Sequence, residues 1–231
     1  MREVVLDTET TGLDVLAGHR IVEIGCVELL NHVPTGKSWQ TYLNPQRENE
    51  REAFEVHGLS DSFLSRQPLF RHKAEEFLAF LQDSVIIIHN AEFDLKFLNH
   101  ELAQHGFDRL SGERVVDSLH LARSIFPGQP NSLDALMRRF GIDATARTRH
   151  GALLDAELLA QVYLELKGGR QADLAFAADA GTERSKTVGT VVAVQLPARP
   201  ARPHQASPEE LARHKAFLDQ IEDALWRRSD G

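Results

Sequence analysis

The continuous apolar run in VIIIHN, residues 85–90, limits the possible folds more than any other feature of this sequence. A strand with one face in water alternates apolar and polar residues, whereas a strand covered on both faces can be apolar throughout. Apolar residues also recur at the spacing of one helix face over residues 74–81 and again over 93–102. The sequence therefore predicts an α/β fold in which buried strands alternate with helices.

The first part of the chain has a different pattern, which is typical of an antiparallel meander. Val4–Leu6 forms one apolar run, IVEIGCVELL at 21–30 forms a second, and SWQTYLNP at 38–45 is predicted as a third strand that ends at Pro45. A short last strand is predicted at VVD, residues 115–117. Together these segments predict a mixed sheet.

Two later helices have recognisable ends. Ser132 is a suitable N-cap for a helix that Gly141 closes. The last helix of the domain is predicted from near Gly151 to Lys167, and it stops at the glycine pair 168–169. We therefore expect one domain over residues 1–169.

The composition changes after residue 169. Residues 170–206 are predicted to be a flexible linker, rich over 177–206 in Ala, Gly, Thr, Pro and Arg, and residues 207–231 a short helical tail. Ser207 followed by Pro208 is a helix start, and a roughly helical apolar stripe follows through Trp226. Because a lone short helix is marginal in water, we expect the tail to need a partner surface.

Charge and cysteine content exclude several classes of protein. The formal net charge is −8, all of it within residues 1–169, which argues against a general nucleic-acid binder that holds long DNA through a basic surface. The single cysteine, Cys26, excludes an intrachain disulfide and fits a reducing cytoplasm. No apolar run approaches the roughly 20 residues of a membrane span, and no targeting segment is expected before the first strand.

Acidic residues lie at the ends of three apolar segments. Asp7 and Glu9 follow the first strand, Asp94 opens the helix after VIIIHN, and His150 and Asp155 lie at the start of the last helix. Hard divalent cations prefer carboxylate oxygens, and a histidine beside them can take a proton from water. Each residue also has a structural explanation: a solvated strand end for DTE, a first-turn helix acid for Asp94, and a surface histidine for His150. His89 and Asn90 could equally fix a turn or touch substrate.

The order of the three motifs is more specific than any one of them. VVLDTETTG, HNAEFD and HGALLD together resemble the three exonuclease motifs of the DEDD superfamily, and the histidine five residues before the last aspartate resembles the DEDDh subgroup. The similarity to the epsilon-subunit family of bacterial DNA polymerase III extends continuously from residue 3 to about 176. It includes EAFEVHGLSDSFL, FPGQPNSLDAL and QADLAF, and it continues more loosely in ALWRR at the end of the tail.

This resemblance implies an RNase H-like fold and a 3′→5′ exonuclease that uses two divalent cations, Mg²⁺ or Mn²⁺. It implies that Asp7 bridges the cations, that Glu9 and Asp155 hold the one beside the attacking water, and that Asp94 holds the one beside the leaving oxygen. His150 corresponds to the general base. Two further residues, Glu52 and the histidine of EVHGLSD, His57, correspond to contacts with the terminal nucleotide; we expect His57 on a loop before a turn.

The resemblance also implies partners: DNA 3′ ends, the polymerase catalytic (alpha) subunit, the sliding clamp (beta) and a small additional core subunit. QADLAF at 171–176 corresponds to a clamp-binding motif, although its apolar residues could instead fold back on the domain. The expected contacts are Gln171, Leu174 and Phe176 with the clamp, and Leu211, Phe217, Leu218, Leu225 and Trp226 with the polymerase. The alternatives are a separate exonuclease acting on RNA or short oligonucleotides, and a mainly structural polymerase subunit.

Overall fold

The computed structural model describes residues 1–145, 147, 149–169 and 206–221. Backbone contacts divide the chain into two compact units, Met1–Ala178 and Asp179–Gly231. The clamp-motif residues 171–176 and the tail residues Leu225 and Trp226 lie outside the described residues.

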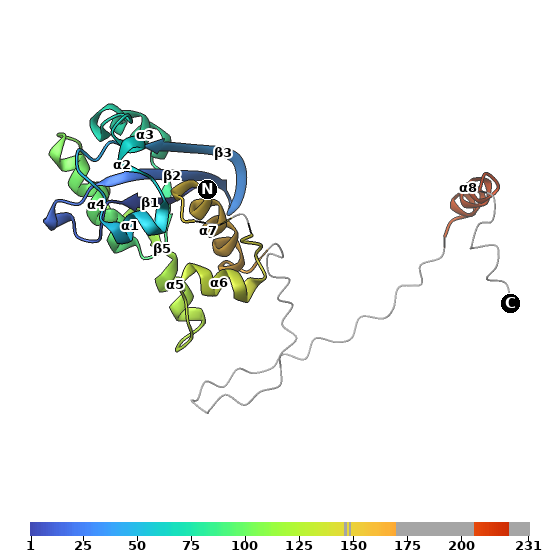
Figure 1. Cartoon of the computed structure of the whole chain (residues 1–231). Helices are drawn as coiled ribbons and strands as arrows, with labels where there is room; N and C mark the ends of the chain where they lie inside the picture. The colour runs from blue at the N-terminus through green and yellow to red at the C-terminus, as the bar shows by residue number, and fades with distance from the viewer. Residues whose placement is uncertain (146, 148, 170–205, 222–231) are drawn as a thin grey trace, which may run out of the picture. The chain divides into compact units, whose positions relative to one another are not determined.

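A mixed sheet of five strands forms the centre of the first unit (Figure 1). Its order is β3-β2-β1-β4-β5; β1 pairs antiparallel with β2 and parallel with β4, as the meander and the buried run predicted. The sheet resembles that of an RNase H-like fold. The strands are β1 (Arg2–Thr10), β2 (Ile21–Leu30), β3 (Val33–Tyr42), β4 (Val85–Ile88) and β5 (Val115–Asp117).

The third strand begins earlier than the sequence predicted. It starts at Val33 rather than near Ser38, because Asn31 and His32 both adopt positive φ angles, 51° and 68°, and make a tight turn from β2. The added residues, 33–37, are all exposed and include no run of buried apolar side chains, and Pro34 is tolerated because β3 is an edge strand. An apolar pattern could not have detected this half of the strand.

Helices cover both faces of the sheet, and three of them were not predicted: α1, α2 and α5. These three are short, with four to eight residues each, and lack a long apolar period. The helices are α1 (Arg51–His57), α2 (Asp61–Leu64), α3 (Ala74–Leu81), α4 (Ala91–Gln104), α5 (Ser118–Ile125), α6 (Leu133–Phe140) and α7 (Ala152–Leu166); the 3₁₀ helices are η1 (Val15–Ala17), η2 (Phe70–His72) and η3 (Gly112–Arg114).

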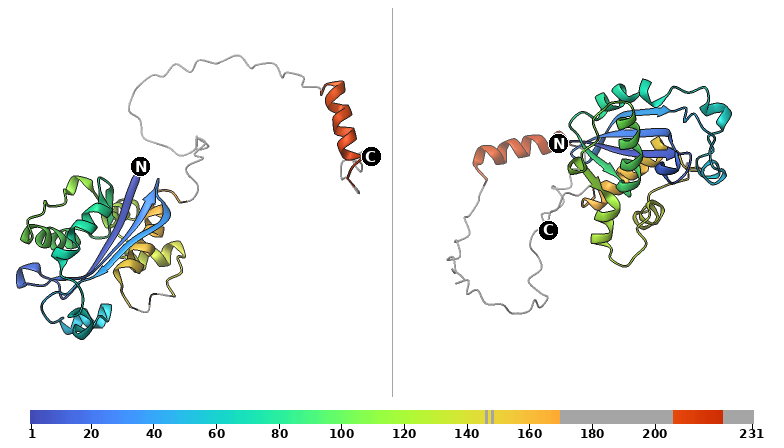
Figure 2. Two further views of the ribbon diagram at one scale, coloured as in Figure 1. Left: turned by 90° about the horizontal axis from the view of Figure 1, so that it is seen from above. Right: turned by 90° about the vertical axis from the view of Figure 1, so that its left-hand side faces the viewer.

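The alternation of side chains along β1 separates two apolar cores. Val4 and Leu6 pack with residues of α3 and α4 on one face, whereas Val5 packs with residues of α7 on the other. Figure 2 shows α7 on the opposite side of the sheet from α4. β4 contributes to both cores and its Ile86, Ile87 and Ile88 are fully buried, which confirms that VIIIHN contains a strand covered on both faces.

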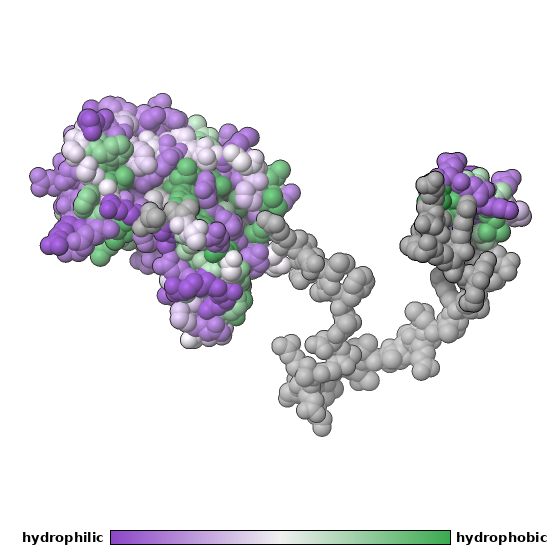
Figure 3. All heavy atoms as spheres, turned by 45° about the vertical axis from the view of Figure 1, so that its right-hand side comes forward, coloured by the Kyte–Doolittle hydropathy of each residue, from purple (hydrophilic) through white to green (hydrophobic). Residues whose placement is uncertain are grey.

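The described part of the second unit is the helix α8 (Pro208–Leu218). The Ser207 hydroxyl accepts from the backbone N–H of Glu210, and the Glu210 carboxylate accepts from the backbone N–H of Ser207, so the predicted helix start is confirmed. The helix ends at Leu218, where Asp219 is the C-cap, so the apolar stripe predicted through Trp226 is not one continuous helix. Hydrophilic and hydrophobic residues both lie on its surface (Figure 3). No described helix is long and apolar enough to cross a membrane.

Candidate active site

Two carboxylates lie on one face of β1. The strand persists through Asp7 and Glu9, which share the alternation of Val5 and therefore the α7 side of the sheet. Asp7 is opposite Gly25 of β2, and Glu9 is opposite Glu23. Because β1 continues through DTE, both carboxylates point to the same face of the sheet.

Gly25 allows α7 to begin directly against the sheet beside Asp7. A Cβ atom at position 25 would lie 2.2 Å from the backbone nitrogen of Leu153 and 2.3 Å from the carbonyl carbon of Ala152. No side chain fits there, because real Cβ atoms essentially never approach within 3.0 Å of other heavy atoms. The close contact places the first turn of α7, which contains Asp155, above β1 and β2.

Glu23 holds the start of α7 in a second way. The helix has Gly151 as N-cap and so has no capping side chain of its own. The backbone N–H groups of Ala152 and Leu153 lie close enough to Glu23 to lower its pKa, and its carboxylate accepts from Gln40 Nε2 at 2.7 Å. Burial raises the pKa of Glu23. A carboxylate of the sheet thus faces the N-terminal end of the helix, where a negative charge is favourable.

Asp94 reaches the same site from the other side of the sheet. It lies in the first turn of α4, just after β4, and is 4% exposed. The turn between strand and helix is tight: Asn90 has a positive φ of 66°. The Thr8 hydroxyl donates to Asp94 Oδ1 at 2.6 Å, which fixes the carboxylate beside the end of β1.

All five expected catalytic and metal-binding residues line one hollow of about 230 Å³. Glu9, His150 and Asp155 offer ligand atoms that all lie within 4.8 Å of one another. Asp7 and Asp94 line the same hollow outside this closest group. The hollow is lined by Asp7, Thr8, Glu9, His89, Asn90, Phe93, Asp94, Leu133, Arg147, His150 and Asp155.

The electrostatics of this hollow favour a cation. Burial raises the pKa of Glu9 to about 8, with Asp155, Glu23 and Asp94 adding repulsion. Burial also raises the pKa of Asp94 to about 7, although hydrogen bonds to that carboxylate act to lower it. Burial and the charge of Asp94 together raise the pKa of Asp7 well above its usual range. Carboxylates crowded in this way are stabilised by divalent cations, and their oxygen atoms suit hard ions. The donor set therefore fits the metal dependence expected from the sequence.

Asp155 differs from the other carboxylates because Arg147 contacts it. Burial alone would raise the pKa of Asp155, but hydrogen bonds from His150 and Arg147 hold it below its ordinary value. Arg147 also donates to Asp134, and its Nη2 lies 2.8 Å from His150 Nδ1. The exposed His150 ring is thereby held through Nδ1, which is also 3.2 Å from Asp155 Oδ2.

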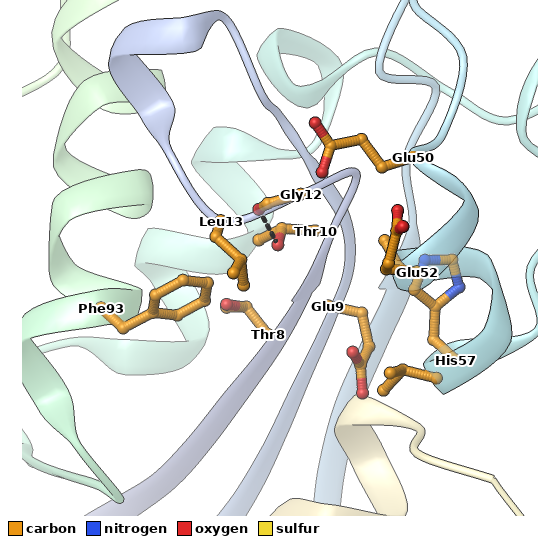
Figure 4. Close-up of a pocket in the computed structure, with 11 residues that line it drawn as sticks. Thr8, Glu9, Thr10, Gly12, Leu13, Glu50, Glu52, His57 and Phe93 are labelled. Atoms are coloured by element: carbon orange, nitrogen blue, oxygen red, sulfur yellow. Dashed lines mark hydrogen bonds between the residues drawn. The ribbon is translucent and has the colours of Figure 1, made fainter.

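A second, more apolar hollow of about 440 Å³ adjoins the carboxylates (Figure 4). It shares Thr8, Glu9 and Phe93 with the carboxylate hollow and is also lined by Leu13, which is 81% exposed. Glu52, an exposed residue of α1, lines it as well. We name it the apolar hollow.

His57 also lines the apolar hollow, but the expectation that it lies on a loop is wrong. It is the last residue of α1, which Gly58 ends in the left-handed region at φ 73°. Its side chain is buried. Its Nδ1 accepts from Leu59 N at 3.0 Å, and burial lowers its pKa, so a neutral ring has its proton on Nε2. No hydrogen bond of ordinary geometry to that atom is present among the described residues.

Sequence reasoning missed three residues that build the site: Glu23, Gly25 and Arg147. An isolated glycine within a strand pattern is a recognised signal of close backbone approach, so IVEIGCVELL contained the information for Gly25. Nothing local marks Glu23 or Arg147, because their roles depend on contacts with α7 and Asp155.

The fold and the carboxylate hollow together define a class: RNase H-like nucleases with acidic metal sites. The model of the exonuclease family (RNase_T) matches residues 4–163. Among solved structures, the chain is similar to exonuclease X in complex with 5′ overhanging duplex DNA, with a TM-score of 0.54 and 22% identity over 72% of this chain and 91% of that one. It is similar to the nuclease domain of 3′hExo, a DEDDh family member bound to rAMP, with a TM-score of 0.62 and 16% identity over 72% and 92%.

Curated relatives are similar over nearly the full length. The DNA polymerase III subunit epsilon of Rickettsia conorii is 45% identical, over 96% of each chain. The subunits of that name from Salmonella typhimurium and Escherichia coli K12 are 43% and 42% identical, over 98% of this chain and 97% of theirs. The chain therefore belongs to the exonuclease family and, within it, to the family of DNA polymerase III epsilon subunits.

Proposed function

We propose that this chain removes mispaired nucleotides from DNA 3′ ends, one at a time, as the proofreading subunit of DNA polymerase III. The observation with most weight is the gathering of Asp7, Glu9, Asp94, Asp155 and His150 around one hollow. The apolar hollow beside it suits a terminal nucleotide, with Leu13 and Phe93 as apolar contacts. The names of its relatives support assembly with the polymerase.

Four carboxylates would hold two divalent cations, Mg²⁺ or Mn²⁺. The cations would lower the pKa of the attacking water and stabilise charge on the attacking and leaving oxygens. The charges of Asp94 and Asp155 both raise the pKa of Asp7, so Asp7 lies near both carboxylates. This position supports its role as the bridging ligand. Glu9 and Asp155 lie together near His150, whereas Asp94 is fixed by Thr8 on the other side.

His150 would take the proton of the attacking water. Its Nδ1 lies 3.2 Å from Asp155 Oδ2, and a neutral ring that donates from Nδ1 to this carboxylate leaves Nε2 free to accept the proton of the water. Its exposed position allows it to exchange that proton with solvent. Glu52 and His57 would contact the terminal nucleotide from α1, the helix that lines the apolar hollow.

Preference for mispaired ends would follow from fraying, since an unpaired terminus costs less to draw into the site than a paired one. The test compares release of mononucleotides from a 3′ mispaired duplex, a matched duplex, single-stranded DNA and RNA of the same sequence. We expect the mispaired duplex and single strand to be degraded faster than the matched duplex, and RNA slowest. Preferential hydrolysis of RNA would instead support the separate RNA exonuclease, and no hydrolysis would support a mainly structural subunit.

The tail, residues 207–231, would bind the polymerase catalytic subunit. Leu211 and Phe217 of α8 are 57% and 60% exposed, and apolar residues on a short helix favour an interface. Leu218, Leu225 and Trp226 would extend the contact. Deleting residues 207–231 should abolish co-purification with the polymerase and leave hydrolysis of free single strands unchanged. Retained co-purification would place the contact on the catalytic domain.

Gln171, Leu174 and Phe176 would dock on the sliding clamp. They lie between five and ten residues after the end of α7 at Leu166. Affinity of so short a peptide should be weak, and tethering through the polymerase would raise its effective concentration. Replacing all three residues by alanine should abolish clamp binding without changing the exonuclease rate; a lost rate would instead show that the segment supports the domain. A small additional core subunit and a place at the cytoplasmic replisome belong to the same proposal.

A further inference from the structure

A third hollow, of about 460 Å³, lies on the other side of the carboxylates from the apolar hollow. It shares His89, Asn90 and Leu133 with the carboxylate hollow and no residue with the apolar hollow. The three hollows therefore follow one another, with the carboxylates in the middle. We name this one the polar hollow, because Arg123, Gln129 and Asn131 also line it.

Arg123 supplies a positive charge that nothing described in the protein neutralises. It is an exposed residue in the last turn of α5, and among the described residues it has no ion pair or hydrogen bond. Asp117, whose charge acts on the neighbouring His89, is already engaged: its Oδ1 accepts from the backbone of Asn90 at 3.1 Å and of Leu119 at 2.8 Å. A free guanidinium in an acidic domain is suited to binding a phosphate.

The wall of the polar hollow is fixed before any ligand arrives. Arg139 of α6 donates to Asn131 Oδ1 at 3.2 Å, to Gln129 Oε1 at 3.1 Å and to Pro130 O at 2.9 Å. Its guanidinium also lies 4.3 Å from the ring centre of Phe126. Asn131 in turn donates to the carbonyls of Phe126 and Gln129. A preformed wall loses little entropy when substrate binds.

We propose that the polar hollow takes the penultimate nucleotide and that Arg123 binds the phosphate on its 5′ side. The inference rests on the proposed function, because hydrolysis of the last phosphodiester leaves the terminal nucleotide on one side of the carboxylates and the penultimate one on the other. The apolar hollow accounts for the terminal nucleotide. The polar hollow is the space that the leaving strand must enter.

The test uses three thymidine substrates with the full-length protein and Mg²⁺. The first is the dinucleotide with a 5′-phosphate, the second is the same dinucleotide without it, and the third is the p-nitrophenyl ester of thymidine 5′-monophosphate, which has no penultimate nucleotide. KM and kcat are measured for wild type, Arg123→Ala and Arg123→Lys. Arg138→Ala is the matched control, since Arg138 is an exposed arginine of α6 that lines none of the three hollows.

Wild type should have a KM about tenfold lower for the phosphorylated dinucleotide than for the unphosphorylated one, the worth of one charged hydrogen-bonded contact. Arg123→Ala should remove this difference, and Arg123→Lys should keep part of it. The variants, Arg138→Ala included, should hydrolyse the p-nitrophenyl ester as wild type does, which shows that the fold and the hydrolytic site are intact.

Equal KM values of wild type and Arg123→Ala for the phosphorylated dinucleotide would overturn the inference. So would a loss of activity on the p-nitrophenyl ester in Arg123→Ala, because that substrate has nothing to place in the polar hollow. A failure of the proposed function is recognised separately: wild type itself would then hydrolyse none of the three substrates.

Discussion

The guanidinium of Arg147 donates two hydrogen bonds to the carboxylate of Asp155, from Nε to Oδ1 at 2.5 Å and from Nη2 to Oδ2 at 2.8 Å. Asp155 is 3% exposed, so this pairing replaces water around a buried charge. The same carboxylate is proposed to bind metal. The Arg147 guanidinium and a bound divalent cation would thus both stabilise the Asp155 carboxylate. Their contributions to stability should be separable by experiment.

Arg147→Ala should destabilise the protein in the absence of divalent metal and much less in its presence. Without the arginine, the buried carboxylate of Asp155 loses its main hydrogen-bond partner, and we expect a loss of about 1–3 kcal/mol in the free energy of unfolding in EDTA. Saturating Mg²⁺ should restore most of this loss. Thermal unfolding with and without Mg²⁺ measures both values, with Arg138→Ala as control. An equal loss of stability with and without Mg²⁺ would show that bound metal does not compensate for the missing arginine.

Gly25→Ala should damage both stability and activity. The new methyl group would lie 2.2 Å from the backbone nitrogen of Leu153, so α7 must move away from the sheet. We expect about 1–3 kcal/mol of destabilisation from overpacking. A displacement of Asp155 near 1 Å could lower kcat by about 10²-fold. Gly112→Ala is the control, since a Cβ atom there meets nothing within 4 Å. A Gly25→Ala protein with normal kcat would show that the close approach does not position the site.

Without divalent metal, the protein should lose stability as the pH rises from about 5 to 9. Burial raises the pKa of Glu9 to about 8 and that of Asp94 to about 7, whereas unfolded carboxyl groups titrate near about 4. Between these values the folded state binds more protons than the unfolded state, so the free energy of unfolding falls with increasing pH. Since metal binding requires the deprotonated groups, the gain in melting temperature on adding Mg²⁺ should grow over the same range. A gain that is constant with pH would contradict this.

His150→Ala should lower kcat by about 10²–10⁴-fold, the usual contribution of a general base. The Nδ1 atom of His150 lies 3.2 Å from Asp155 Oδ2, so the two residues are close enough to bind the same cation. Metal affinity must therefore be measured in the same variant. We expect the Mn²⁺ affinity measured by titration to be nearly that of wild type. A decrease as large as that of Asp155→Ala would make His150 a metal ligand instead.

The sequence predicted those parts of the fold whose side chains form a periodic pattern. The buried strand at β4, the meander of β1 and β2, and the capped starts of α6 and α8 follow from local residues. The exposed half of β3 and the short helices α1, α2 and α5 have weak patterns, so they were missed. His57 was placed on a loop because Gly58 suggested a turn, whereas that glycine ends a helix.

The site was predictable to a different extent. Asp7, Glu9, Asp94 and Asp155 were found because the three motifs that contain them resemble, in the same order, those of the DEDD exonucleases, and the four residues meet in one hollow. The groups that hold them could not be found in this way. Glu23 acts on the backbone of α7, and Arg147 on Asp155, through contacts that exist only after the chain has folded.

The most direct test of the carboxylate site is the Mg²⁺-dependent release of mononucleotides from a 3′ mispaired duplex by Asp7→Ala. Asp7 repels Asp94, Glu9 and Asp155, so its removal should relieve crowding while it eliminates the proposed bridging ligand. We expect hydrolysis at the background level, with a melting temperature in EDTA equal to or above that of wild type. Asp108→Ala, an exposed aspartate outside the hollows, should be fully active. Normal hydrolysis by Asp7→Ala in Mg²⁺ would contradict the account.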